Sequence, residues 1–137
     1  MQYKLLKLGF ESAPMTTDSG VDLVLFSPSS GEVLTVQVKA NDAPKPGGGK
    51  GKLALDWWIA EDCPSELAAF LDVSADTAWL MTKEELSGFA QQRSGGRFHF
   101  YMYTDSSARP RGAKPAMRAD FDAHLLERKA ALLLAAR

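Results

Sequence analysis

Three polar side chains interrupt two apolar segments early in the chain, and their types suit phosphate chemistry. Asp22 precedes the apolar segment 23–26, and Gln37 and Lys39 lie near the end of the next one. Carboxylate and amide oxygens are ligands that Mg²⁺ accepts, and a lysine ammonium stabilises charge that develops on a phosphate. If the fold brings them together, these residues predict metal-assisted hydrolysis of a phosphodiester.

A hairpin would bring the three residues together. Residues 28–31 read Pro-Ser-Ser-Gly, which are turn-forming residues. A four-residue turn at that point pairs Asp22 with Gln37 on one face, about 5 Å apart at Cβ, and makes Lys39 a diagonal neighbour. The other pairs in this register are Val24 with Thr35 and Phe26 with Val33.

The same hairpin has a purely structural interpretation. Lysine is common on edge strands, where it discourages pairing with other chains. Amide and lysine side chains are also ordinary on the solvated face of a sheet. Spacing alone therefore leaves both an active site and a solvated sheet edge open.

The spacing resembles that of the PD-(D/E)xK nuclease superfamily. Gly-x-Asp at 20–22 is followed by Gln-x-Lys at 37–39, with Gln in place of the acid of the second half-motif. The likeness is nearest to restriction-endonuclease-like and Holliday-junction-resolvase-like members. It implies an α/β fold in which helices flank a mixed central sheet, a Mg²⁺ ion held by Asp22 and Gln37, and a Lys39 that assists catalysis.

Two departures from the family pattern bear on activity. The first helix, expected over 2–8, contains no Asp or Glu, so Glu11 in the following strand is a further candidate metal ligand. Gln37 is neutral, which leaves Asp22 as the only carboxylate in the motif. Two functions therefore stay open: an endonuclease acting on nucleic acid, and a nuclease-fold protein that has lost cleavage and binds nucleic acid or protein.

Charge is unevenly distributed although the net charge is only −1. Residues 39–52 and 93–118 are basic, whereas residues 53–86 are acidic. If the two basic segments converge in space, they could bind a polyanion, with DNA as the expected partner. The candidate nucleic-acid-binding residues are Lys45, Lys50, Lys52, Arg109 and Arg111.

Length, cysteine content and the distribution of apolar residues indicate the domain organisation and the cellular compartment. A length of 137 residues suits one domain, here 1–137, with one core. The single cysteine, Cys63, excludes an internal disulfide and fits a reducing compartment. The N-terminus is too short and too charged for a signal peptide, and no apolar run reaches the roughly 20 residues of a membrane span. The expectation is a cytoplasmic protein without membrane association, with a homodimer through the last helix as an open alternative.

The spacing of apolar residues and the positions of proline, glycine and capping residues predict the helices and strands that must position these residues. Pro64 at a first-turn position favours a helix, and the capping box at 82–85 favours another. Trp57, Trp58 and Trp79 are expected in the core. The predicted helices are 2–8, 63–71, 82–91 and 120–135; the predicted strands are 10–13, 21–27, 32–40, 52–60, 78–81 and 98–103; the predicted loops are 41–51 and 105–116.

Overall fold

The computed structural model describes residues 1–47 and 51–135 and contains two β-sheets. The first sheet has five strands in the order β1-β2-β3-β6-β7, and the second has four in the order β4-β5-β9-β8. Strands β3 and β6 are parallel, and every other neighbouring pair is antiparallel. The first-sheet strands are β1 (Glu11–Pro14), β2 (Leu23–Ser27), β3 (Glu32–Asn41), β6 (Leu67–Asp72) and β7 (Thr77–Thr82). The second-sheet strands are β4 (Lys45–Gly47), β5 (Lys52–Ala60), β8 (Gln92–Ser94) and β9 (Arg97–Tyr103).

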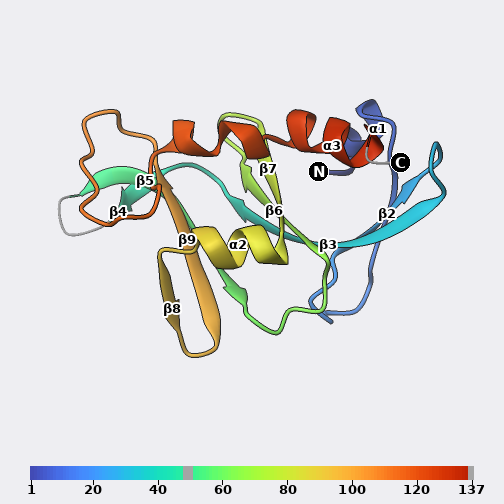
Figure 1. The fold of residues 1–137 in the computed structure, drawn as a ribbon, viewed down its shortest axis with the longest axis horizontal. Coiled ribbons are helices and arrows are strands. Elements are labelled where there is room, and N and C mark those ends of the chain that lie inside the picture. The colour runs from blue at the N-terminus through green and yellow to red at the C-terminus, as the bar shows by residue number, and fades with distance from the viewer. Residues whose placement is uncertain (48–50, 136–137) are drawn as a thin grey trace.

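Helices complete the layers on both sides of the five-stranded sheet (Figure 1). One face of this sheet packs against α1 and α3 through a cluster that includes Leu5, Val36 and Leu126. The opposite face packs against α2 and the inner face of the four-stranded sheet. The helices are α1 (Gln2–Lys7), α2 (Lys83–Phe89) and α3 (Leu126–Ala135), with the 3-10 helix η1 (Arg118–His124) before α3. The predicted mixed sheet flanked by helices is confirmed.

Aromatic side chains fill the space between the two sheets. The Trp57 ring of β5 lies 5.1 Å from that of Phe70 on β6, and Phe100 meets Phe121 edge-to-face at 4.9 Å. Trp57 and Trp79 are buried as predicted. The prediction was wrong for Trp58, which is half-buried and stacks on His99 outside this core.

The largest error concerns the predicted helix at 63–71. Residues Leu67–Asp72 form strand β6, which lies between β3 and β7 and has four consecutive buried residues at its start. Because a strand buried on both faces shows no alternation, a short apolar run of this kind resembles a buried helix. Pairing with two neighbours then outweighs the weak strand preference of its alanines.

Smaller differences lie at the other elements. Lys45–Gly47, predicted as loop, pairs with β5 as strand β4. The last predicted helix is divided, because η1 ends at His124 before α3 begins. The capping box is confirmed: the Thr82 side chain accepts a hydrogen bond from the Glu85 amide, and Glu85 accepts one from the Thr82 amide. In the described parts of the chain, no helix is long and apolar enough to cross a membrane.

Candidate active site

The β2–β3 hairpin has the register expected from the sequence. Val24 pairs with Thr35 and Phe26 pairs with Val33. The paired ladder ends at Leu23 and Val36, so the expected Asp22–Gln37 pair is not part of it, and the Asp22 amide instead donates to the Val36 carbonyl at 2.9 Å. Asp22 is therefore aligned with the part of β3 that carries Gln37.

The Asp22 carboxylate lies directly on that part of β3. Its Oδ2 accepts a hydrogen bond of 2.6 Å from the Val38 amide, the residue between Gln37 and Lys39. Val38 lies beyond the end of the β2–β3 ladder, so the Asp22 carboxylate takes the place of a strand partner for its amide. The side chain of Asp22 is exposed, and an ionised carboxylate bonded once keeps further acceptor positions.

A neighbouring loop fixes the backbone that carries Asp22. The carbonyl of Gly20 accepts a hydrogen bond from Ser65 Oγ at 2.6 Å, and the Cys63 sulfur lies 3.3 Å from the same carbonyl. Gly20 has a φ of +80°, and a Cβ built there would lie 2.8 Å from Pro64 Cδ. Only glycine satisfies both the left-handed backbone and this close approach.

Gln37 and Lys39 occupy alternate positions of β3 and so share one face of the sheet. Both side chains are half-buried. The Oε1 atom of Gln37 accepts a hydrogen bond of 2.9 Å from the Cys63 thiol, which ties β3 to the segment before β6. The structure therefore places the Asp22 carboxylate against the backbone of β3 between Gln37 and Lys39.

The remaining candidate ligand, Glu11, is not part of this group. Glu11 pairs with Phe26, four positions from Asp22 along β2, which corresponds to roughly 13 Å at the rise of a strand. Among the described residues, no group of three or more His, Cys, Asp or Glu side chains could hold a metal ion. Besides Asp22, Glu66 contacts β3: its Oε2 accepts hydrogen bonds from the Thr35 amide at 3.0 Å and from the Thr35 hydroxyl at 3.3 Å.

The donor set at the site is chemically suited to Mg²⁺. The Asp22 carboxylate and the Gln37 amide oxygen are hard oxygen ligands. Mg²⁺ commonly binds through one or two carboxylates and keeps several waters, so a single carboxylate fits one ion better than two.

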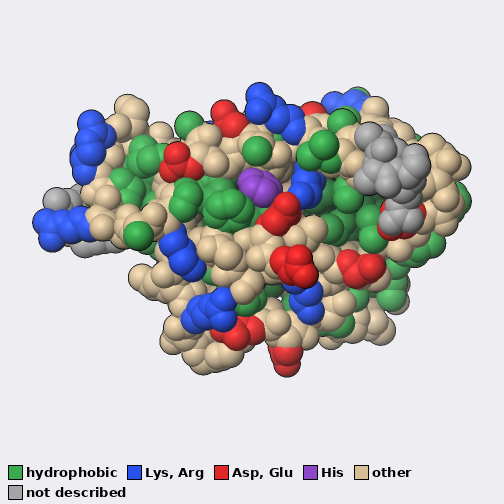
Figure 2. Space-filling model, viewed as in Figure 1, with side chains coloured by type: hydrophobic (Ala, Val, Ile, Leu, Met, Phe, Trp, Pro, Cys, Tyr) green, Lys and Arg blue, Asp and Glu red, His purple; other side chains and the backbone are tan. Residues whose placement is uncertain are grey.

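Parts of the two basic segments lie close together in space, as polyanion binding would need. Strand β4 and segment 104–116 lie together at one end of the molecule (left in Figure 1), where Figure 2 shows several lysine and arginine side chains. A hollow of about 260 Å³ at this end is lined by Lys52, Arg109 and Arg111. Lys52 Nζ donates to Ser107 Oγ at 2.7 Å, which ties β5 to that segment. Lys45 is exposed on β4, and Lys50 lies outside the described residues.

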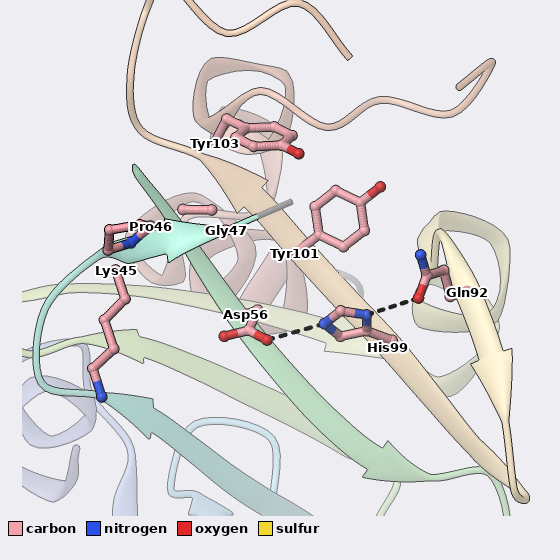
Figure 3. Close-up of a pocket in the computed structure, with 9 residues that line it drawn as sticks. Lys45, Pro46, Gly47, Asp56, Gln92, His99, Tyr101 and Tyr103 are labelled. Atoms are coloured by element: carbon pink, nitrogen blue, oxygen red, sulfur yellow. Dashed lines mark hydrogen bonds and ion pairs between the residues drawn. The ribbon is translucent and has the colours of Figure 1, made fainter. Parts of the chain in front are cut away.

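A second polar cluster, which the sequence analysis missed, lies on the outer face of the four-stranded sheet. His99 Nε2 lies 3.1 Å from Asp56 Oδ2, and His99 Nδ1 lies 3.3 Å from Gln92 Oε1 (Figure 3). The rings of Tyr101 and Tyr103 follow along β9 and line the same hollow of about 180 Å³. Trp58, His99, Tyr101 and Tyr103 are called the outer aromatic face below.

Tyr101 of this face is a neutral hydrogen-bonding group at ordinary pH. Burial, together with the neighbouring Tyr103, raises the pKa of the Tyr101 phenol above its usual value. The two rings meet edge-to-face, with centroids 5.8 Å apart. Tyr101 therefore keeps its proton and can donate a hydrogen bond.

The signal for the outer aromatic face was present in β9. Phe98, Phe100 and Met102 are buried, whereas the intervening positions point outward. The outward positions are Arg97, His99, Tyr101 and Tyr103, a run of large side chains that carry polar groups. The partner Asp56 could not be identified in advance, because it depends on the pairing of β5 with β9.

Comparisons with known proteins address the fold. No protein-family model matches the chain, and a search of curated proteins finds no match. Among solved structures, the chain is similar to the bacterial homing endonuclease I-Ssp6803I, with 17% identity and a TM-score of 0.59 over 98% of this chain and 83% of that one. This likeness, together with the sheet order and helices described above, defines a restriction-endonuclease-like fold.

Two further structures are more distant. The Archaeoglobus fulgidus Holliday junction resolvase Hjc is 14% identical, with a TM-score of 0.47 over 72% of this chain and 75% of that one. MepB is 11% identical, with a TM-score of 0.42 over 85% of this chain and 84% of that one.

Proposed function

We propose that this chain is a metal-dependent endonuclease that hydrolyses phosphodiesters of nucleic acid, with DNA as the first substrate to test. The observation that carries the proposal is the bond from the Val38 amide to Asp22 Oδ2 at 2.6 Å. This bond supports the proposal because it holds the one carboxylate of the motif against β3, at the position between Gln37 and Lys39. The proposal extends to a single domain over 1–137 that acts in the cytoplasm.

Each residue of the site has a distinct role in this proposal. Asp22 and Gln37 would hold Mg²⁺, which when bound supplies Lewis-acid activation of the phosphodiester and of water. The Lys39 ammonium stabilises the charge that develops on the phosphate. The Cys63 thiol, through its bond to Gln37 Oε1, orients that amide.

Substrate binding is proposed for the basic end of the molecule. Lys45, Lys50, Lys52, Arg109 and Arg111 would contact phosphates, and such contacts position a nucleic acid without reading its sequence. Neutralising them would weaken binding in a salt-dependent manner.

Cleavage assays with Mg²⁺ or Mn²⁺ on linear and branched DNA test the proposal. Asp22→Asn and Lys39→Ala should each lower the cleavage rate by about 100-fold or more, the scale of removing one group that stabilises the transition state. The matched controls Asp122→Asn and Lys83→Ala change exposed residues on η1 and α2 and should cleave as the wild type does. Equal rates for all variants would overturn the assignment.

The single carboxylate supports a second candidate, a nuclease-fold protein that binds nucleic acid without cutting it. Glu11 does not reach Asp22, and Gln37 carries no charge to add to the site. This alternative predicts DNA binding that Mg²⁺ and Mn²⁺ leave unchanged, with no product on any substrate.

Homodimerisation is the remaining part of the proposal. Helix α3 packs on the five-stranded sheet through Leu126 and Ala130, yet Leu132 is 62% exposed. Sedimentation of the wild type and of Leu132→Glu tests whether this exposed side of α3 joins two copies, because a charge there would separate them.

A further inference from the structure

We propose that the outer aromatic face binds unpaired nucleotides of a single-stranded nucleic acid, whose bases stack on Tyr101 and Tyr103 and whose phosphates reach Lys52, Arg109 and Arg111. The proposal rests on the proposed function in one respect, that the ligand is a nucleic acid. It adds a binding site on a different sheet and a preference for unpaired strands.

The rings of this face form a continuous row. The Trp58 and His99 rings are stacked at 4.2 Å and an interplanar angle of 2°, and His99 lies 5.3 Å from Tyr101. Tyr101 then lies 5.8 Å from Tyr103. Base stacking on successive aromatic side chains is the common means by which proteins hold single strands, since every base has a π-face to offer.

Polar groups occupy the hollow beside the row. Asp56, His99 and Gln92 form a hydrogen-bonded chain across it, as Figure 3 shows. The Asn41 side chain holds the backbone of Asp56 through bonds of 2.9 and 3.0 Å, which fixes this chain in place. Amide and carboxylate groups of this kind hydrogen-bond to the edges of unstacked bases.

Positive charge adjoins the row at the Tyr103 end. Tyr103 lines both the hollow that contains His99 and the hollow lined by Lys52, Arg109 and Arg111. A third hollow joins Tyr101 and Tyr103 to Arg111 and Lys114. A strand whose bases lie on the tyrosines therefore has cationic side chains within its path, which is the arrangement that single-strand binding uses.

Unpaired nucleotides fit this face better than a duplex does. Stacking on a tyrosine needs the face of a base, and in a duplex both faces of an internal base are covered by its neighbours. The rings of Tyr101 and Tyr103 are half-buried and lie along β9, so they present a sheet surface on which bases can stack.

Anisotropy of a fluorescein-labelled dT oligomer of about 12 nucleotides tests the proposal in EDTA, which prevents cleavage. Tyr101→Leu and Tyr103→Leu should each weaken binding about tenfold, and Tyr101→Phe should retain wild-type affinity because the ring is kept. Tyr3→Leu is the matched control, since Tyr3 is 71% exposed on α1 and should not affect binding. Thermal melts of all variants check that they are folded.

The outcomes separate this inference from the proposed endonuclease. Tyrosine-dependent binding without cleavage at any metal concentration supports the inference and overturns the nuclease assignment. Metal-dependent cleavage of duplex DNA with dT binding that is absent or indifferent to Tyr101→Leu overturns the inference alone. Tighter binding to a duplex than to dT in the wild type also overturns it.

Discussion

The β2–β3 hairpin and the outer aromatic face both gather polar side chains on a strand, but they do so over different distances in the sequence. Asp22 contacts the backbone of Val38, 16 positions away across one turn. Asp56 contacts His99, 43 positions away, through two strands of another sheet. A site formed within one hairpin can be derived from alternation and turn residues, whereas a site formed by distant strands needs the fold.

Strand β3 connects the two regions physically. It carries Gln37 and Lys39 and ends at Asn41, whose side chain bonds to the backbone of Asp56 on β5. Asn41 takes the place of a strand partner at that point, because β4 pairs with β5 only as far as Ala54. The Asn41 side chain therefore links the hairpin site to the outer aromatic face. Substitutions away from Asn41 can disturb one region and leave the other unchanged.

The largest expected effect comes from Gly20→Ala, which disturbs the hairpin and leaves the outer aromatic face alone. The added Cβ would meet Pro64 Cδ at 2.8 Å, and alanine is strained at a φ of +80°. We expect a loss of about 3 kcal/mol in the free energy of unfolding, with cleavage reduced because Asp22 shifts.

Gly31→Ala is the matched control, since its φ is +74° and no atom lies within 4 Å of the added Cβ. Urea unfolding should show the smaller loss for this variant, about 1 kcal/mol. Equal losses for the two alanines would show that the Pro64 contact does not constrain the loop.

Asn41→Ala tests the connection between the two regions and should have the next largest effect. It leaves the amide and carbonyl of Asp56 without the side-chain partner, at a cost of about 2 kcal/mol in the free energy of unfolding. Because Asp56 holds His99, dT binding should fall further than cleavage does. Asp42→Ala, an exposed neighbour, is the control, and a larger loss of cleavage than of dT binding would contradict the connection.

The smallest expected effect is a pH dependence that comes from neither region. Burial lowers the pKa of His124, an effect that Lys129 reinforces and Glu85 opposes. Below pH 6.5 the unfolded chain then binds more protons than the folded chain, so stability should fall as the pH drops from 6.5 through the folded pKa. His124→Gln should remove this slope in urea unfolding between pH 8 and 5, and a slope that persists would contradict the assignment.

At lower pH a second group should contribute. Burial raises the pKa of Glu85, but the Lys129 hydrogen bond, the Thr82 amide and nearby positive charges outweigh burial and lower it. Stability that is present above about pH 4.5 should therefore be lost as the pH falls through the folded pKa. Glu85→Gln should flatten this second decline, since the carboxylate joins α2 to Lys129 of α3.

Local chemistry explains which features could be predicted. The hairpin register followed from one turn and from alternation, and the α2 N-terminus followed from Thr82 and Glu85. Strand β6 could not be identified, because an apolar run buried on both faces carries no periodic signal and its parallel partner β3 lies far away in the sequence. The outer aromatic face was missed for a related reason: β9 shows alternation, but its polar partners come from β5 and β8.

The central claim is that Asp22 and Gln37 share one divalent metal ion, and Gln37→Glu tests it most directly. If the claim holds, restoring the acid of the second half-motif adds a negative ligand beside Asp22, and Mn²⁺ measured by calorimetric titration should bind about tenfold tighter than to the wild type. Adding Asp22→Asn to this variant should abolish the gain. Unchanged Mn²⁺ affinity in Gln37→Glu, or a gain that persists without the Asp22 carboxylate, would contradict a shared metal site on the hairpin.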